Sequence, residues 1–178
     1  RLYGLEIQAG MVDMARRSVE LNHLTGKIII EEGDLREAVA RYGSSRFDVV
    51  VSNPPYNLAG LGQLNASDSQ KLARHEITCT LEDVVAAAGK IVKSRGRFAL
   101  VHKPHRLVDL FVLLRSYRLE PKRLQVVYGR PGQKPGFVLV EAVKDGGVEL
   151  KILNPLYIYD ASSEYTAELR DIYFGERE

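Results

Sequence analysis

The chain has 178 residues, of which 45% are hydrophobic and 27% charged, as in an ordinary globular protein long enough for one α/β domain. Cys79 is the only cysteine, which excludes a disulfide framework and a CxxC metal site and favours a reducing, cytoplasmic compartment. No apolar run approaches the roughly 20 residues that a membrane span needs, and a formal net charge of +2 permits an RNA partner without demanding one.

The first part of the chain predicts alternating strands and helices. The run Ile28-Ile29-Ile30 marks the centre of one strand, and apolar residues at helical spacing mark the helix before it. Residues 47–51, Phe-Asp-Val-Val-Val, form an apolar run typical of a strand buried on both faces. The expected elements are a strand over 2–7, a helix over 11–21, a strand over 27–31, a helix over 35–42 and a strand over 47–52. This order and spacing predict a parallel βαβ sheet.

The second part predicts further helices and ends with antiparallel strands. Thr80 can cap a helix over 81–93, although its capping-box position holds Asp83 rather than Glu or Gln. Pro121 is expected to break the chain, and Asp145-Gly146-Gly147 predicts a tight hairpin turn between strands 137–143 and 148–153. The other expected elements are strands over 97–102 and 124–128 and helices over 106–116 and 165–174.

The sequence Asn53-Pro54-Pro55-Tyr56 follows the strand 47–52 without a linker. Two prolines cannot continue a central strand, so these residues are expected at the carboxyl edge of the sheet, where open α/β folds place ligands. The side-chain carbonyl of Asn53 and the Pro54 carbonyl can accept hydrogen bonds from an NH2 group. Tyr56 offers a flat face for a planar group such as a base. Together they suit a planar amine as nucleophile, although a plain proline-rich turn is the alternative interpretation.

This tetrapeptide after a buried strand resembles the signature of S-adenosylmethionine-dependent amino-methyltransferases, which methylate adenine N6, guanine N2, cytosine N4 or glutamine N5. The resemblance implies a Rossmann-like, class I methyltransferase fold whose sheet is mostly parallel with an antiparallel C-terminal hairpin. It also implies one methyltransferase domain over residues 1–178. In that family a first strand and a Gly-rich turn precede the position of Arg1, so we expect the domain to be N-terminally incomplete in this chain.

The resemblance assigns S-adenosylmethionine as cofactor and five residues to its binding. Glu6, with Ile7 after it, ends the first strand, where the family binds ribose hydroxyls. Asp34 would accept from the adenine amine of the cofactor, and the backbone N–H of Leu35 would meet a ring nitrogen. Asn53 would lie between the cofactor and the acceptor. A solvated acid for Glu6 and a helix N-cap for Asp34 are the alternatives.

The substrate side of the motif points to RNA. Arg74 and His75 follow the loop 57–69, and similar stretches occur in bacterial enzymes that methylate adenine N6 in the anticodon loop of a valine tRNA. The tail resembles the same group at Pro121-Lys122-Arg123-Leu124, at residues 154–159 and at Tyr165-Thr166. Lys103 and Arg106, with Tyr56, are further candidates for RNA contact, and a solvated surface is the alternative for each.

These observations predict a methyltransferase that acts on the exocyclic N6 of adenine in tRNA, with the base flipped onto Tyr56 and no metal required. Three alternatives stay open. They are a protein-glutamine N5-methyltransferase, an rRNA guanine N2-methyltransferase, and a non-catalytic module that binds RNA or a partner. The sequence predicts no membrane association and does not predict an oligomeric state.

Overall fold

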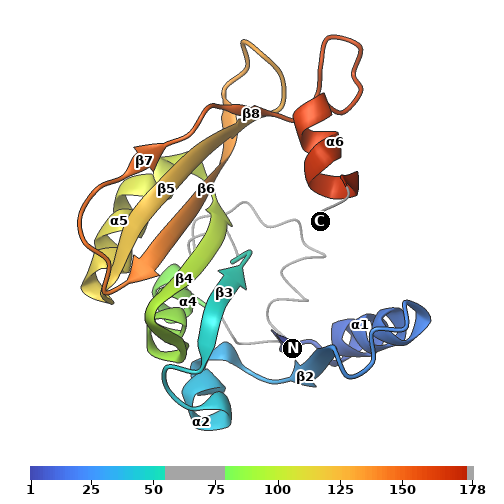
Figure 1. The fold of residues 1–178 in the computed structure, drawn as a ribbon, viewed down its shortest axis with the longest axis vertical. Coiled ribbons are helices and arrows are strands. Elements are labelled where there is room, and N and C mark those ends of the chain that lie inside the picture. The colour runs from blue at the N-terminus through green and yellow to red at the C-terminus, as the bar shows by residue number, and fades with distance from the viewer. Residues whose placement is uncertain (55–78, 176–178) are drawn as a thin grey trace, which may run out of the picture.

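The structure, a computed structural model, describes residues 1–54 and 79–175. The described strands form a two-stranded sheet, β1-β2, and a six-stranded sheet in which β3, β4, β6, β5 and β7 are neighbours in that order and β8 also pairs with β5. Figure 1 shows the two sheets one above the other, with the small sheet near the N-terminus. None of the described helices is long and apolar enough to span a membrane.

The small sheet is a parallel pair connected by one helix. Strands β1 (Leu2–Glu6) and β2 (Ile28–Glu32) pair in register from Leu2↔Ile28 to Glu6↔Glu32, and α1 (Ala9–Leu21) links them. Their carboxyl ends are therefore level with each other. The 3-10 helix η1 (Leu35–Glu37) and the short helix α2 (Ala38–Tyr42) follow β2 directly. The predicted strand-helix-strand order of this part is confirmed.

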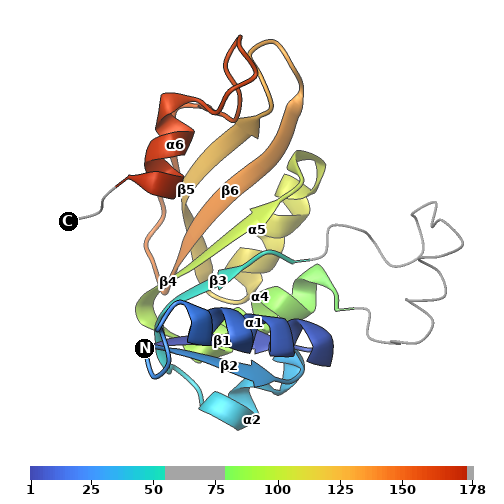
Figure 2. The same cartoon turned by 90° about the vertical axis from the view of Figure 1, so that its right-hand side faces the viewer.

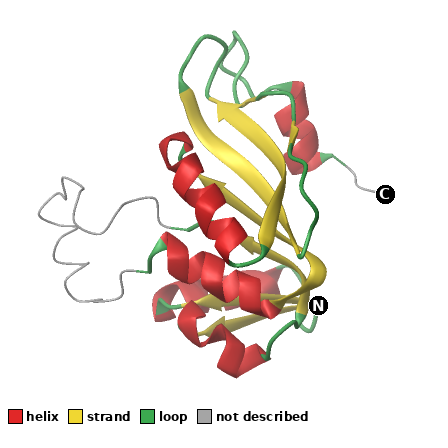
Figure 3. Cartoon of the chain, turned by 90° about the vertical axis from the view of Figure 1, so that its left-hand side faces the viewer, coloured by secondary structure: helices red, strands yellow, loops and turns green. Residues whose placement is uncertain are grey.

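The large sheet carries one pair of helices on one face and a single helix on the other. Its strands are β3 (Phe47–Ser52), β4 (Val92–His102), β5 (Leu119–Tyr128), β6 (Pro135–Lys144), β7 (Lys151–Ile152) and β8 (Leu156–Tyr157). The helices are α4 (Leu81–Ile91), α5 (Leu107–Ser116), preceded by η2 (Pro104–Arg106), and α6 (Ala167–Phe174). Figures 2 and 3 show α4 and α5 on one face and α6 on the opposite face.

The main core lies between the large sheet and the pair α4 and α5. Val85 of α4, Leu110 and Leu114 of α5, and Phe98 of β4 are fully buried there. Apolar residues recur at helical spacing along α4, and this pattern predicted its buried face. Complete burial of these side chains makes the contact between α4, α5 and the sheet the main source of hydrophobic stabilisation.

The sheet is mixed, so the prediction of a mostly parallel sheet is wrong. Strand β3 pairs with β4 in parallel, but β6 pairs antiparallel with both β4 and β5. The hairpin therefore joins β5 to β6, not strands 137–143 and 148–153. Pro121 does not break the chain as predicted, because it lies inside β5 at a register irregularity opposite Ala142, where a missing N–H is tolerated.

The segment after β6 leaves the sheet instead of turning back antiparallel. Lys122 Nζ donates to the carbonyl oxygens of Gly147 and Val148 at 3.1 and 2.9 Å, which holds this segment across β5. The chain then returns to β5 as β7 in a parallel register, with Arg123 opposite Lys151. The predicted turn at Asp145-Gly146-Gly147 is thus a crossing connection.

Strand β3 is not buried on both faces, contrary to the prediction. Val50 packs against the main core, but Val49 and Val51 are 46% and 74% exposed. Within the described residues β3 pairs with β4 alone, so its other edge and part of one side are exposed to solvent. A cavity of about 550 Å³, lined by residues of β1, α2, β3 and α4, separates β3 from the small sheet.

Three aromatic rings meet in the lining of this cavity. Tyr3 of β1, Tyr42 of α2 and Phe47 of β3 meet edge-to-face, with centroid separations of 5.4 to 5.8 Å. The Tyr42 hydroxyl also donates to Glu31, and burial followed by this hydrogen bond raises the pKa of Tyr42 to about 12. The cluster therefore connects the two sheets in the described structure.

Candidate active site

The carboxyl end of β3 presents the first half of the tetrapeptide. The ladder between β3 and β4 runs to Ser52↔Leu100, after which Asn53 and Pro54 leave the strand. Asn53 is exposed and Pro54 is buried. The second half of the motif, Pro55 and Tyr56, lies outside the described residues. The described half thus stands at the edge of the sheet where a ligand can reach the Asn53 amide.

The carboxyl end of β1 presents the carboxylate of Glu6. Its Oε1 accepts a hydrogen bond from the Gln8 backbone N–H at 2.9 Å, and its carbonyl oxygen accepts from the Gly33 N–H at 2.9 Å. The second bond continues the contact between β1 and β2 one residue beyond the strands. Ile7, 37% exposed, follows Glu6 directly. A carboxylate held in this way can accept from two neighbouring hydroxyl groups.

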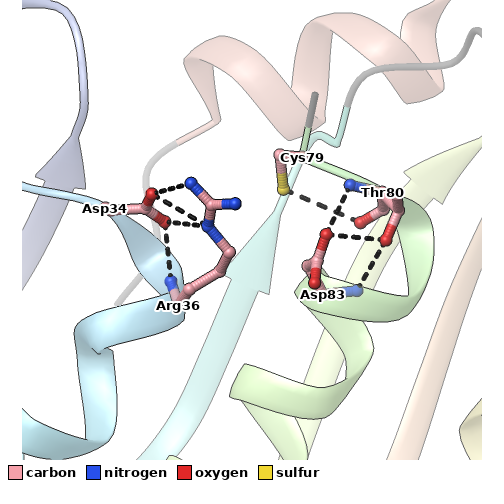
Figure 4. Close-up of polar contacts among 5 residues, drawn as sticks. All are labelled: Asp34, Arg36, Cys79, Thr80 and Asp83. Carbon is pink, nitrogen blue, oxygen red and sulfur yellow. Dashed lines mark hydrogen bonds and ion pairs between the residues drawn. The ribbon is translucent and has the colours of Figure 1, made fainter. Parts of the chain in front are cut away.

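The carboxyl end of β2 leads to Asp34, which Arg36 holds in place. Oδ1 of Asp34 accepts from the Arg36 backbone N–H at 2.9 Å and caps η1, so the N-cap interpretation is confirmed. Arg36 Nε lies 3.0 and 2.9 Å from the two carboxylate oxygens, and its Nη2 donates to Oδ2 as well (Figure 4). The hydrogen bond from Arg36 is the largest cause that lowers the pKa of Asp34. Asp34 is therefore a fixed, ionised acceptor.

The N-terminus of α4 faces this ion pair. Thr80 and Asp83 form a complete capping box, in which the Asp83 N–H donates to Thr80 Oγ1 at 3.1 Å and Asp83 Oδ2 accepts from the Thr80 N–H at 2.8 Å. Aspartate thus fills the position where Glu or Gln was expected. Figure 4 shows Cys79, Thr80 and Asp83 opposite Asp34 and Arg36. Burial, followed by the charges of Asp83 and Asp34, raises the pKa of Cys79, so its thiol is held protonated.

The predicted basic residues Lys103 and Arg106 lie just after β4. Because β3 and β4 are parallel, both follow the same edge of the sheet as Asn53. Lys103 Nζ is 3.9 Å from the centroid of the Phe137 ring, which is cation–π geometry. Arg106 is more enclosed, with its side chain 15% exposed and its Nε 2.7 Å from Asp109 Oδ2. Asp109 therefore compensates the charge of Arg106.

Two further predicted residues, Arg74 and His75, lie outside the described residues, so the structure does not place them. Arg36 is the site residue that the sequence interpretation missed. Its signal was present, because an arginine two residues after a strand-terminal aspartate can reach back to that carboxylate. The position of Asp34 at a strand end predicted a helix cap or a ligand contact, and neither prediction includes the cation that neutralises it.

The sequence has curated relatives that share one name. The tRNA1(Val) (adenine(37)-N6)-methyltransferase of Porphyromonas gingivalis (strain ATCC 33277) is 32% identical over 173 residues, which cover 94% of this chain and 67% of that protein. The protein of the same name from Bacteroides fragilis is 27% identical over 173 residues, or 95% of this chain and 71% of that protein. The chain belongs to this methyltransferase family. No protein-family profile matches the sequence.

Solved structures agree with a methyltransferase fold. A protein from Agrobacterium tumefaciens, described as a predicted O-methyltransferase, has a TM-score of 0.74 and 25% identity, covering 97% of this methyltransferase and 76% of that chain. The geranyl diphosphate C-methyltransferase of Streptomyces coelicolor has a TM-score of 0.57 at 10% identity, covering 81% and 62% of the two chains. The second likeness concerns the fold alone. The expected Rossmann-like, class I fold is thereby confirmed, with a mixed sheet.

Proposed function

We propose that this methyltransferase transfers the methyl group of S-adenosylmethionine to the exocyclic N6 of an adenine in the anticodon loop of a valine tRNA. The observation that carries the proposal is the position of Asn53 and Pro54 at the carboxyl edge of β3, in a chain 32% identical to a tRNA1(Val) (adenine(37)-N6)-methyltransferase. The names of the relatives favour adenine in tRNA over a protein glutamine or an rRNA guanine as acceptor. With tRNA as its substrate, the protein would act in the cytoplasm.

The carboxyl ends of β1 and β2 fit the polar parts of the cofactor. Glu6 would accept hydrogen bonds from the two ribose hydroxyls, with Ile7 beside it. Asp34 would accept one from the adenine amine, and the backbone N–H of Leu35 would meet a ring nitrogen. Support comes from the fixed carboxylates, because Gln8 and Arg36 already orient them as acceptors. A preorganised acceptor loses less entropy when a ligand binds.

The residues at the end of β3 would hold the acceptor amine. The Asn53 side-chain carbonyl and the Pro54 carbonyl would each accept one of its two hydrogens, and Tyr56 would stack on the flipped base. Both acceptors stabilise the positive charge that develops on nitrogen as its lone pair attacks. S-adenosylmethionine supplies an electrophilic methyl group when bound. As the nitrogen–carbon bond forms, the carbon–sulfur bond breaks, its electron pair stays on sulfur, and the amine releases a proton to water.

RNA contact would involve the basic residues around this edge. Lys103 is the main candidate, because its ammonium group lies against the Phe137 ring beside the end of β4. Arg106 would be a second candidate, with its guanidinium held by Asp109. Arg74 and His75 would approach from the segment that follows the tetrapeptide. Phosphate contacts of this kind position an RNA without reading its sequence.

Label transfer to bulk tRNA tests the proposal. The protein is incubated with S-adenosylmethionine labelled in its methyl group, and the tRNA is digested to nucleosides. We expect label in N6-methyladenosine, which Asn53→Ala abolishes. Asn154→Ala is a matched control, since Asn154 also precedes a proline but lies beyond β7, and it should keep the activity. Label in a protein glutamine or in rRNA guanine, with none in tRNA, would overturn the substrate assignment.

A further inference from the structure

Four aromatic rings form a continuous row near the C-terminus. Tyr159, Tyr165, Tyr173 and Phe174, here called the aromatic strip, follow one another with centroid separations of 5.5, 6.3 and 6.0 Å. Their exposed fractions rise along the row from 37% and 40% to 66% and 74%. The rings of Tyr159 and Tyr165 are nearly parallel, at 24°. Large exposed aromatic residues that touch one another are unusual on a protein surface unless a partner covers them.

The segment that carries the strip is anchored by contacts other than the exposed rings. Thr166 Oγ1 caps α6 by accepting from the Leu169 N–H at 3.3 Å, and its hydroxyl donates to the Tyr157 carbonyl at 2.6 Å. Leu169 is the buried residue of α6 and packs against Val127 and Leu156. An antiparallel bridge also joins Tyr159 to Tyr165. These anchors fix the helix through one buried side chain, so the exposed rings are not needed for its attachment.

One arginine contacts the strip and a second lies on helix α6. Arg130 lies over the Tyr159 ring, with its guanidinium carbon 5.9 Å from the centroid, and its Nη2 donates to Ser163 Oγ at 2.6 Å. At helical spacing Arg170 falls between Tyr173 and Phe174 around α6. The acidic residues of the helix, at positions 168 and 171, fall on its other flank. Arg130 and Arg170 therefore bring positive charge to the strip, while Asp160 and Glu164, between Tyr159 and Tyr165, bring negative charge.

The strip lies beyond the same sheet edge as the methyl-transfer motif. Strand β6 begins where β4 ends, since His102 pairs with Val138, and β5 ends beside it. The pairing of Tyr128 with Tyr157 attaches β8, and with it α6, to the end of β5. Because β3 and β4 are parallel, this is the edge at which β3 ends. A ligand that reaches β3 from this edge can extend toward the strip.

We propose that the aromatic strip binds unpaired nucleotides of the RNA substrate that flank the target adenine. Exposed bases stack on aromatic side chains, and arginines beside such rings add contacts to phosphates and cation–π stacking. Bases inside a duplex have no free faces, so the strip would select single-stranded loops over helical stems. This assignment rests on the proposed function, because it assumes that the substrate is RNA with an accessible loop.

Binding of a fluorescent RNA hairpin tests the assignment independently of methyl transfer. The probe is a stem-loop with seven unpaired loop nucleotides, compared by anisotropy with a fully paired duplex of the same length. The variant is Tyr173→Ala with Phe174→Ala. Ile172→Ala is the matched control, since Ile172 lies on the same helix, is 45% exposed and belongs to no ring contact of the strip. Circular dichroism verifies that each variant is folded.

We expect the double variant to raise the Kd for the stem-loop about ten-fold or more, because stacking of one base contributes about 1–3 kcal/mol. The double variant should change the Kd for the duplex by less than two-fold. Ile172→Ala should change the Kd for the stem-loop by less than two-fold. Equal weakening of both RNAs, or no weakening of the stem-loop, would overturn the proposal. A third outcome would also overturn it: sedimentation shows a dimer of the wild type, and the double variant is monomeric but still binds RNA. A second copy of the chain would then cover the strip.

The two proposals fail in different ways. If the wild type methylates no tRNA and binds neither probe, the proposed function fails and the assignment fails with it. If the wild type methylates tRNA and the double variant binds the stem-loop as tightly, only the assignment of the strip fails. Photo-crosslinking of a stem-loop with 5-iodouracil in its loop should attach the RNA to the peptide that contains Tyr173. Crosslinks confined to other peptides would contradict the assignment.

Discussion

Arg36 donates three of its N–H groups to the carboxylate of Asp34, at the point where the chain leaves β2. A carboxylate has about four acceptor positions, so this clamp leaves room for one more donor. The arrangement suits a single N–H of an adenine amine, and it explains how a partly exposed aspartate keeps one orientation. The side chain of Asp34 is 19% exposed and that of Arg36 46%.

We predict that Arg36→Met raises the Kd for S-adenosylhomocysteine about ten-fold, since a hydrogen bond to a charged group contributes about 1.5–3 kcal/mol. Titration calorimetry measures the change. Arg17→Met is the control, because Arg17 forms a comparable ion pair with Asp13 on the exposed surface of α1. An unchanged Kd in Arg36→Met, or an equal change in Arg17→Met, would show that the clamp does not serve the cofactor.

The same pair predicts a dependence of stability on pH. The hydrogen bond from Arg36 lowers the pKa of Asp34 in the folded protein below its value of about 3.9 in an unfolded chain. The stabilisation is therefore fully present above pH 4 and is lost as the pH falls through the lower, folded pKa. Urea unfolding at pH 6 and pH 3 should show a smaller loss of stability for Arg36→Met than for the wild type. Identical losses in both proteins would contradict this linkage.

The capping box of α4 predicts a defined loss of stability. Thr80→Ala removes the oxygen that accepts from the Asp83 N–H and should lower the free energy of unfolding by about 1 kcal/mol. Ser44→Ala, at an exposed turn before β3, should change it by less than about 0.5 kcal/mol. Chemical denaturation compares the two variants. A Thr80→Ala protein as stable as the wild type would mean that the N-terminus of α4 frays in solution.

Helix α5 offers a matched pair for the core. Leu110 is fully buried, whereas Val112 on the same helix is 65% exposed. Leu110→Ala should lower the free energy of unfolding by about 2–5 kcal/mol through lost burial and a new cavity. Val112→Ala should change the free energy of unfolding by less than about 0.5 kcal/mol, not counting the difference in helix propensity between valine and alanine. Similar effects of both changes in denaturant titrations would contradict the packing of α5 on the sheet.

Local patterns predicted the elements well, because each helix and strand of the first part carries its own periodicity. The strand expected over 27–31, the helix expected over 11–21 and the cap at Thr80 follow from residues close in sequence. The pairing of distant strands depends on contacts that no local pattern contains. Lys122 reaches the carbonyls of residues 147 and 148, and this tertiary contact replaced the predicted hairpin with a crossing connection.

Some residues of the candidate site could be predicted from local sequence, and others could not. The motif at Asn53 and the acid at Asp34 could be identified from residue type and position at strand ends. The Arg36 clamp and the aromatic strip could not, because each depends on side-chain directions and on packing after folding. Strand β3 was expected to be buried on both faces from its apolar composition, yet burial depends on what surrounds a strand and not on the strand alone.

The most direct test of the central claim uses a transcript of the valine tRNA in place of bulk tRNA. The protein is incubated with this transcript and S-adenosylmethionine, and the product is cut into defined fragments and analysed by mass spectrometry. The account predicts one methyl group per tRNA, on N6 of the adenine at position 37 that the relatives' name specifies, and none when guanine replaces that adenine. A methyl group on another nucleotide, or undiminished methylation of the guanine transcript, would contradict it.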